Sequence, residues 1–318
     1  ASGPPLVRWL LDTRTIWAGE NIADAQAAEH LALIGADERA DVVRKHNARD
    51  ARMSLGSALL KRLFATRALG IPWDAVRLGR RGDARHGKPC VRLADGRDAA
   101  ADFNVTHQAG IVALVGCAAA DVEVGVDVVC VNERNDYRVI DRDGFDGWVD
   151  LYEDFFSDEE RWDMKYNVDR VTLLDGRTLS GEQLGRADRC CVRDQTVTIK
   201  LPTAPASSPS TTTMQIPSDL IVDAKLRRFY AFYSYKEAFI KLTGDALLAA
   251  WLRELEFRHV LAPRPGTAPR CSTLGVWGEV LVDDGVEIWL RGERVRDVRL
   301  ELRAFEEDYM IATAVRRR

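Results

Sequence analysis

The 318-residue sequence contains no apolar run of the roughly 18–20 residues that a membrane-spanning helix needs. Residues 1–5 lack a basic stretch followed by an apolar core, so no secretory signal is expected there. The net charge of −4 gives the chain as a whole no attraction for nucleic acid. We therefore expect a cytoplasmic protein that binds neither membranes nor nucleic acid.

Cysteine is scarce and follows no metal-binding or disulfide pattern. The six cysteines form no CxxC pair and have no zinc-like spacing with the five histidines. The adjacent Cys190 and Cys191 cannot readily bridge each other. A reduced protein without a zinc site is the expectation.

The common catalytic and nucleotide-binding motifs are also absent. The sequence has neither the GxxxxGK[ST] phosphate loop nor the GxGxxG fingerprint. It contains no HExxH and no GxSxG. Any chemistry must therefore come from residues that these motifs do not describe.

The pattern of apolar residues that is present predicts helices followed by strands, twice. A helix over 40–69 precedes apolar strands at 111–116 and 122–129, and a helix over 225–243 precedes short strands that end with 309–315. With 46% apolar residues the chain can bury a substantial core. This order predicts an α+β fold of two similar halves.

The boundary between the two halves is expected near the second apolar strand. We assign residues 1–121 to the N-terminal half and 122–318 to the C-terminal half. The second half contains a surface insertion at about 163–217. Its part rich in proline, serine and threonine, 202–217, predicts a linker without regular structure.

The segment 232–241 places charged residues among aromatic ones in a helix-forming run. Glu237 and Lys241 are four apart and so share one helix face. A carboxylate beside an ammonium suits a metal-bound phosphate, because the acid holds the cation while the ammonium meets phosphate oxygens. For this segment alone an exposed salt bridge is the simpler interpretation.

Two further acids stand where a carboxylate needs an explanation. Asp127 interrupts an apolar strand, which requires that it be paired, bound to metal or placed at a turn. Glu160 follows Ser157 by three residues at a helix start, a pattern typical of a capping box. A carboxylate at that position is also a candidate general base.

Several donors with affinity for phosphate are spread along the first half. Thr106 and His107 bring a hydroxyl and an imidazole to a strand edge. Lys88 lies in a cationic loop, and Arg44 and Arg52 flank the start of the first long helix. Taken singly, each is equally explained as a structural or solvated side chain.

In this order the motifs resemble one family: GKP at 87–89, FN-x-TH at 103–107, GVD at 125–127, FFS-x-x-E at 155–160 and KEA-x-x-K at 236–241. The chain is similar to 4′-phosphopantetheinyl transferases of the larger, pseudo-dimeric Sfp type, most closely the fungal members. The resemblance covers nearly the whole chain apart from the insertion.

The resemblance implies an activity with its cofactor and partners. Such enzymes use Mg²⁺ and move the phosphopantetheine arm of coenzyme A to a serine of an apo acyl or peptidyl carrier domain, releasing 3′,5′-ADP. The carriers belong to polyketide, nonribosomal peptide and fatty acid synthases and to aminoadipate reductase. Because two halves build one site, a monomer is expected.

The resemblance also implies roles for individual residues. Asp127 and Glu237 would ligate Mg²⁺, with water in the place where many bacterial members have a second acid and this chain has Val129. Glu160 would be the base for the serine proton, a metal ligand or both. Lys241 would stabilise charge on the transferred phosphate or protonate the leaving group.

The remaining implied contacts are with coenzyme A. His107 matches the position that meets the 3′-phosphate. Tyr233 departs from the tryptophan that often precedes the KEA motif by three residues, but it keeps an aromatic ring, so only its packing role is expected to persist. The residues implied to hold the coenzyme A phosphates are Lys88, Thr106, His107, Lys241 and, less directly, Arg44, Arg52 and Lys236.

Two other functions fit parts of the same pattern. A non-catalytic protein that binds carriers or coenzyme A would be expected to lose the metal ligands, whereas Asp127, Glu237 and Lys241 are present. An acyltransferase acting on a thioester would need its own base, and Glu160 is the one candidate among the residues considered.

Overall fold

The computed structural model describes residues 6–23, 26–83, 87–202, 211–244, 251–267, 275–283 and 285–318. The predictions for residues 1–5 and for the middle of the linker, 203–210, lie outside these ranges. Among the helices described, none combines the length and apolar character that crossing a bilayer requires. The cysteines described are free, as the sequence predicted: Cys90, Cys117, Cys130, Cys190 and Cys191.

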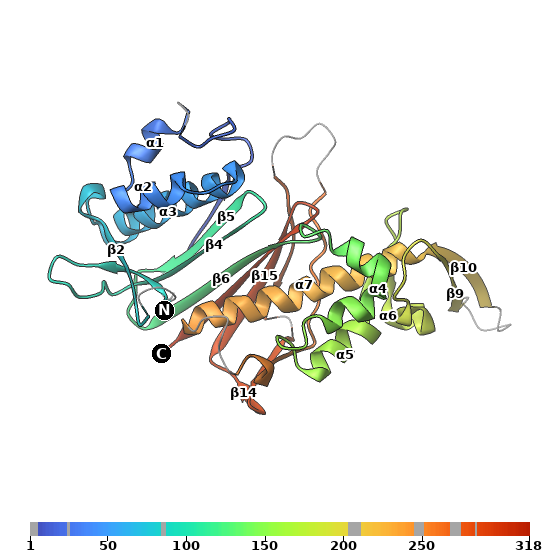
Figure 1. The fold of residues 1–318 in the computed structure, drawn as a ribbon. Helices are drawn as coiled ribbons and strands as arrows, with labels where there is room; N and C mark the ends of the chain where they lie inside the picture. Colours follow the sequence, from blue (N-terminus) through green and yellow to red (C-terminus); the bar gives the residue numbers. More distant parts are fainter. Residues whose placement is uncertain are drawn as a thin grey trace.

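The first sheet is antiparallel, with the strand order β1-β5-β4, and helix α3 packs across one of its faces (Figure 1). The predicted helix over 40–69 is wrong at its start, because the chain forms two helices there. Asn47 is extended and its side chain accepts a hydrogen bond from Arg49 N, which begins a new helix. The elements are β1 (Val7–Asp12), α1 (Ala28–Ala32), α2 (Ala36–Val43), α3 (Ala48–Leu69), β2 (Arg77–Arg80), β3 (Pro89–Arg92), β4 (Asp102–Gln108) and β5 (Ile111–Cys117).

The second sheet is also antiparallel, with the order β12-β15-β16-β6, and the long helix α7 lies along one face (Figure 1). The predicted helix over 225–243 is present, but it begins seven residues earlier at Ser218. The strands and helices around this sheet are β6 (Val122–Cys130), α4 (Asp136–Asp150), α5 (Asp158–Tyr166), α7 (Ser218–Thr243), β11 (Leu255–Arg258), β12 (Trp277–Val282), β13 (Glu287–Leu290), β14 (Glu293–Val295), β15 (Val298–Phe305) and β16 (Tyr309–Arg317).

The two sheets meet along β4 and β6, which lie side by side without sharing a strand ladder. Side chains join them instead: Asp102 of β4 accepts a hydrogen bond from Val124 N of β6 at 2.8 Å. Apolar residues of β5 and β6 form a common core beneath this seam. The fold is therefore a mixed α+β arrangement whose helices α3 and α7 each cover one sheet.

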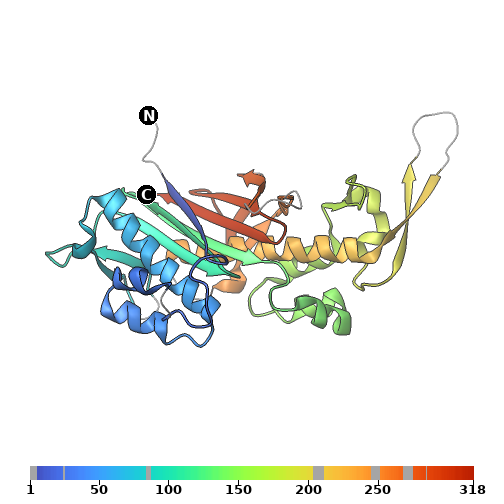
Figure 2. The ribbon, with the colours of Figure 1, turned by 90° about the horizontal axis from the view of Figure 1, so that it is seen from above.

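The insertion packs against the N-terminal part of α7. It forms a small apolar core with that helix, and the β9–β10 hairpin projects away from the rest of the molecule (Figure 2). The prediction of a linker without regular structure over 202–217 is wrong, because Thr211–Pro217 pairs with β9 in an antiparallel ladder. The elements are β7 (Arg170–Thr172), β8 (Thr178–Ser180), α6 (Gly181–Leu184), β9 (Thr196–Pro202) and β10 (Thr211–Pro217).

Candidate active site

The candidate site depends on a close approach between α7 and β6 at Gly125. A Cβ placed on this glycine would lie 2.0 Å from the carbonyl oxygen of Ala238 and 2.5 Å from the nitrogen of Leu242. Only a residue without a side chain allows the helix backbone to come this near to the strand. The contact brings the last turns of α7 next to Asp127, two residues further along β6.

Asp127, Lys241 and Thr106 form one buried polar cluster across the seam. Lys241 Nζ donates to Asp127 Oδ1 at 2.5 Å and to Thr106 Oγ1 at 3.1 Å. The Thr106 hydroxyl in turn donates to Asp127 Oδ1 at 3.1 Å. Asp127 is buried, whereas the Lys241 side chain keeps 27% of its surface exposed, so the cluster opens to solvent at the ammonium.

Glu237 lies one turn before Lys241 on the same face of α7 and close to Asp127. Within the described part of the chain, its Oε1 is buried and has no hydrogen-bond partner. Burial and the nearby Asp127 carboxylate raise the pKa of Glu237 to about 7. Burial likewise raises the pKa of Asp127, against the opposing charge of Lys241. Two close carboxylates, one with an open acceptor, form a site that a cation would stabilise.

The raised pKa predicts that Mg²⁺ binding depends on pH. Below a pKa of about 7 Glu237 holds a proton, which must leave before the carboxylate can bind a cation. The dissociation constant for Mg²⁺ should therefore rise as the pH falls, approaching about tenfold per unit. Calorimetric titration of the protein with Mg²⁺ in two buffers of different ionisation enthalpy measures both the affinity and the proton released. An affinity that stays constant from acidic to mildly alkaline pH would contradict the prediction, and Glu237→Gln should bind weakly without a pH step.

His107 lies beside this cluster on the side of the first half. Its pKa is lowered, first because surrounding atoms exclude water from part of the ring and then because Lys241 and Lys45 are positively charged. The side chain nevertheless keeps an exposed surface. Lys241 and Lys45 therefore form a cationic edge around His107, and this edge suits an anion with several phosphates.

The two arginines predicted near α3 are engaged elsewhere. Arg44 is exposed and pairs with Asp41 at 2.8 Å. Arg52 donates to the carbonyl oxygen of Gly19 at 2.6 Å. Of the basic residues in this region, Lys45 is the one whose charge acts on His107, and the sequence pattern gave no reason to prefer it over its neighbours.

Glu160 and Lys236 form a separate buried pair. Lys236 Nζ donates to Glu160 Oε2 at 2.7 Å, and Oε2 also accepts from Ser157 N at 3.0 Å. Phe257 N donates to the other oxygen at 2.9 Å. Burial raises the pKa of Glu160 and lowers that of Lys236. Both oxygens are occupied, so the arrangement offers no support for Glu160 as base or metal ligand, or for Lys236 as a phosphate contact.

The described residues contain no group of three or more histidine, cysteine, aspartate or glutamate side chains arranged to hold a metal ion. Glu160 therefore does not join Asp127 and Glu237 in one ligand set. Val129, at the position of a second acid in many bacterial relatives, is buried in the apolar core beneath α7. A cation here would be held by two carboxylates, with its other ligands from phosphate and water.

Replacing Glu160 by glutamine tests these roles. Glutamine keeps the capping geometry but leaves the Lys236 ammonium buried without its counter-charge, which costs about 3 kcal/mol or more of unfolding free energy. We expect a clear fall in melting temperature and a kcat within about tenfold of the unmodified protein. A kcat loss of about a hundredfold or more at unchanged stability would instead identify Glu160 as the base.

Lys88 is buried, and its ammonium is bound within the protein. It forms an ion pair with Asp102, and it donates to the carbonyl oxygen of Leu242 at 3.1 Å. Burial lowers the pKa of Lys88, whereas Asp102 opposes this effect. Lys88 thus contacts the end of α7 instead of the exposed edge formed by His107 and Lys241.

Two residues near Glu237 were not predicted to take part. The charge of Arg134, an exposed residue after β6, opposes the rise in the pKa of Glu237. Burial raises the pKa of Tyr233, and the charges of Glu237 and Asp127 add to this rise. Tyr233 and Glu237 are four residues apart on one helix, and this spacing could have indicated that Tyr233 lies near the site. Nothing in the sequence indicated the same for Arg134.

Comparison with known proteins places this chain in a family. A family profile described as "4′-phosphopantetheinyl transferase, N-terminal" matches residues 21–119. A 4′-phosphopantetheinyl transferase of Aureobasidium melanogenum is 57% identical over 98% of this chain and 90% of its own length. 4′-phosphopantetheinyl transferase A of Aspergillus fumigatus is 34% identical over 98% of this chain and 83% of its own length.

A more distant relative matches part of the chain. It is the L-aminoadipate-semialdehyde dehydrogenase-phosphopantetheinyl transferase of Schizosaccharomyces pombe, 29% identical over 38% of this chain and 47% of its own length. The full-length matches span both sheets and the seam that carries Asp127, Glu237 and Lys241. The chain therefore belongs to the 4′-phosphopantetheinyl transferases.

Proposed function

We propose that this transferase moves the 4′-phosphopantetheine arm of coenzyme A to a serine hydroxyl of an apo carrier domain and releases 3′,5′-ADP. In this reaction the serine oxygen forms a bond to the β-phosphorus, and the bond from that phosphorus to the bridging oxygen of ADP breaks. The observation that carries the proposal is the convergence of Asp127, Glu237, Lys241 and Thr106 at the seam between the two sheets.

The carboxylate pair fits Mg²⁺, the cation that the family implies. Glu237 Oε1 is a buried acceptor without a partner in the described residues, and Asp127 is close enough to raise its pKa. Hard oxygen ligands of this kind are the ones that Mg²⁺ takes in proteins, usually one or two carboxylates with phosphate and water. When bound, Mg²⁺ would neutralise charge on the pyrophosphate of coenzyme A.

Lys241 and Thr106 would bind the pyrophosphate. In the structure the Lys241 ammonium donates a hydrogen bond to Asp127 Oδ1 and so serves as the counter-charge of that carboxylate. Its partial exposure leaves it able to meet a phosphate oxygen from solvent. From there it can stabilise the charge that develops on the transferred group and deliver a proton to the departing ADP oxygen.

We propose that the exposed cationic edge binds the 3′-phosphate end of coenzyme A. His107 and Lys45 lie there beside Lys241, and the lowered pKa of His107 makes a neutral imidazole that donates from one ring nitrogen. Arg44 and Arg52 would contribute only by leaving their present partners, Asp41 and Gly19.

The partner proposed is an apo acyl or peptidyl carrier domain. Carriers of polyketide, nonribosomal peptide and fatty acid synthases are proposed from the family, and the Schizosaccharomyces pombe relative adds aminoadipate reductase. We further propose that residues 1–121 and 122–318 are related by a pseudo-twofold axis and that one chain forms the complete site.

Transfer is tested by mass spectrometry of the carrier. The protein is incubated with Mg²⁺, coenzyme A and several purified apo carriers, with a carrier whose serine is changed to alanine as control. A gain of one phosphopantetheine on the serine carriers alone is the expected result. Unchanged mass across all carrier types would favour the non-catalytic binding function. In a parallel incubation with acetyl-coenzyme A, a gain of one acetyl group without the pantetheine arm would favour a thioester acyltransferase.

A further inference from the structure

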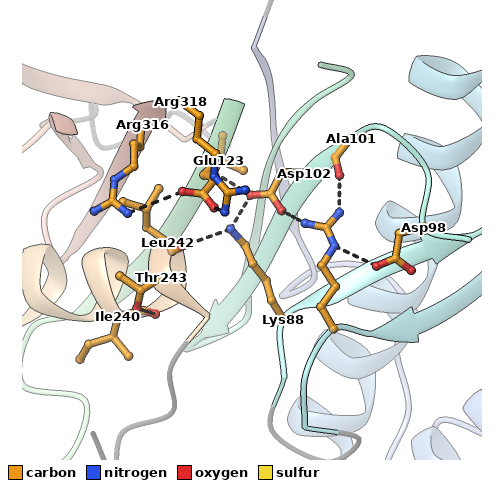
Figure 3. A network of polar contacts seen from close by, with 12 residues as sticks. Lys88, Asp98, Ala101, Asp102, Glu123, Ile240, Leu242, Thr243, Arg316 and Arg318 are labelled. Atoms are coloured by element: carbon orange, nitrogen blue, oxygen red, sulfur yellow. Dashed lines mark hydrogen bonds and ion pairs between the residues drawn. The ribbon is translucent and has the colours of Figure 1, made fainter. Parts of the chain in front are cut away.

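We propose that Lys88 is a positioning residue, which holds the C-terminal end of α7 against the first half and so sets Lys241 opposite Asp127. This inference rests on the proposed transferase function. The family resemblance assigns a coenzyme A phosphate to this lysine, whereas in the structure its ammonium pairs with Asp102 and donates to the carbonyl oxygen of Leu242 (Figure 3).

The first contact is with the end of α7. The last carbonyl groups of a helix have no partner within the helix, and that end carries a partial negative charge. Thr243 Oγ1 and Gly244 N both donate to the carbonyl of Ile240, and Lys88 Nζ donates to the carbonyl of Leu242 at 3.1 Å. Lys88 thus caps α7 with a cation that comes from the other half of the chain.

The stem of Lys88 lies near Gly244, the residue that ends the helix. Gly244 has a φ of +81°, a backbone conformation that side chains disfavour. A Cβ placed on Gly244 would lie 3.4 Å from the Cβ of Lys88, in van der Waals contact. Both parts of the lysine therefore lie at the end of α7: the aliphatic stem lies near the terminal glycine, and the ammonium donates to the carbonyl of Leu242.

The second contact fixes the ammonium to both strands of the seam. It pairs with Asp102, the first residue of β4, which is only 2% exposed. Asp102 also accepts from Val124 N of β6 at 2.8 Å and from Arg81 Nη1 at 2.8 Å (Figure 3). Lys88 therefore links the end of α7 to the two strands that carry Thr106 and Asp127, in addition to the contacts that Lys241 makes with them.

These contacts affect the catalytic cluster directly. Leu242 follows Lys241, so a shift of the helix end moves the ammonium that meets Asp127 and Thr106. If the Lys88 ammonium turned from Asp102 to a phosphate, the buried Asp102 carboxylate would lose one of its two cationic partners and keep only Arg81, which is unfavourable. The geometry therefore favours a lysine that acts on the reaction through Lys241.

Lys88→Met tests this role, because methionine keeps most of the stem and removes the charge. We expect kcat to fall by about tenfold to a hundredfold, from misplacement of Lys241, while KM for coenzyme A stays within about twofold. The same loss should occur with 3′-dephospho-coenzyme A as substrate. A KM increase above about tenfold at nearly normal kcat, or a loss that disappears with 3′-dephospho-coenzyme A, would overturn the proposal in favour of a phosphate contact.

Asp102→Asn gives a second measurement. A positioning role and a phosphate-binding role of Lys88 predict different effects of this substitution on kcat and on KM for coenzyme A. A positioning lysine loses its anchor, so kcat should fall as in Lys88→Met, and the double variant should lose little more than either single one. A phosphate-binding lysine would be released for its ligand, so KM for coenzyme A would fall. That result would overturn the proposal even if Lys88→Met proved too unstable to assay.

Lys225→Met is the matched control on the same helix. Lys225 is fully buried and donates to the carbonyl oxygens of Lys165 and Cys190, near the opposite end of α7. We expect it to lower the melting temperature while kcat stays within about twofold. If it lowers kcat as much as Lys88→Met does, the effect is general destabilisation and the positioning role is refuted. Failure of the unmodified protein to transfer the arm would instead refute the proposed function.

Discussion

Replacing Asp127 by asparagine should reduce kcat/KM for transfer by about a thousandfold or more. The change removes a carboxylate charge and leaves an amide of the same shape, so the fold is expected to persist. Misplacing the Lys241 ammonium, which meets the developing charge, costs about a hundredfold to a thousandfold by itself, and loss of a cation ligand adds to it. Lys241 would also lose the acceptor that holds its ammonium at 2.5 Å.

The measurement is a steady-state assay of carrier modification over a range of Mg²⁺ concentrations, with a thermal melt of each variant. Glu237→Gln should show a loss of similar size, because it supplies the other carboxylate of the pair. Burial raises the pKa of Asp127, so removing its charge should not lower the melting temperature much. A variant of Asp127 that retains activity within about tenfold would exclude this carboxylate as a metal ligand.

Replacing Gly125 by alanine should lower activity by about a hundredfold without touching a charged group. The added methyl would meet the carbonyl oxygen of Ala238 at 2.0 Å, and backbone atoms cannot rotate away as a side chain can. α7 must therefore move away from β6 and carry Glu237 and Lys241 with it. A displacement of about 1 Å at a catalytic group is enough for a loss of this size.

The same substitution should lower the unfolding free energy by about 1–3 kcal/mol, the usual cost of overpacking. Gly147→Ala in α4 is the matched control, because its methyl meets only the Cβ of Asp143, at 3.1 Å, and alanine favours a helix. It should keep full activity. Normal transfer by Gly125→Ala would show that the close approach of α7 to β6 is not needed for the reaction.

Local patterns predicted the elements that carry the site. The strand of β6 with its single aspartate and the helix that holds Glu237 and Lys241 form where the apolar pattern placed them, and Thr106 and His107 lie in a strand, β4, as expected. The errors lie at boundaries and in polar segments. Asn47 starts a new helix inside the predicted one, and the segment from Thr211 to Pro217 pairs with β9 where a linker was predicted.

Predictions of the role of individual charged residues were less accurate, because a lysine or a glutamate can pair with many different groups in a folded protein. Lys241 was expected to serve phosphate and does lie at an open edge beside Asp127. Lys88 and Lys236 carry the same ammonium group, and both they and the carboxylate of Glu160 were expected to serve the same site. In the structure Lys88 is paired with Asp102, and Lys236 with Glu160, in buried positions.

The sequence by itself therefore determined the α+β elements, the family and the spacing that puts Glu237 and Lys241 on one face of a helix. Only the tertiary structure decided which charged groups meet each other. Lys241 and Asp127 are 114 residues apart, and Lys88 and Leu242 are 154 apart, so no local pattern records either contact. Both contacts depend on how closely α7 approaches the seam. Gly125 allows this short distance because it has no side chain.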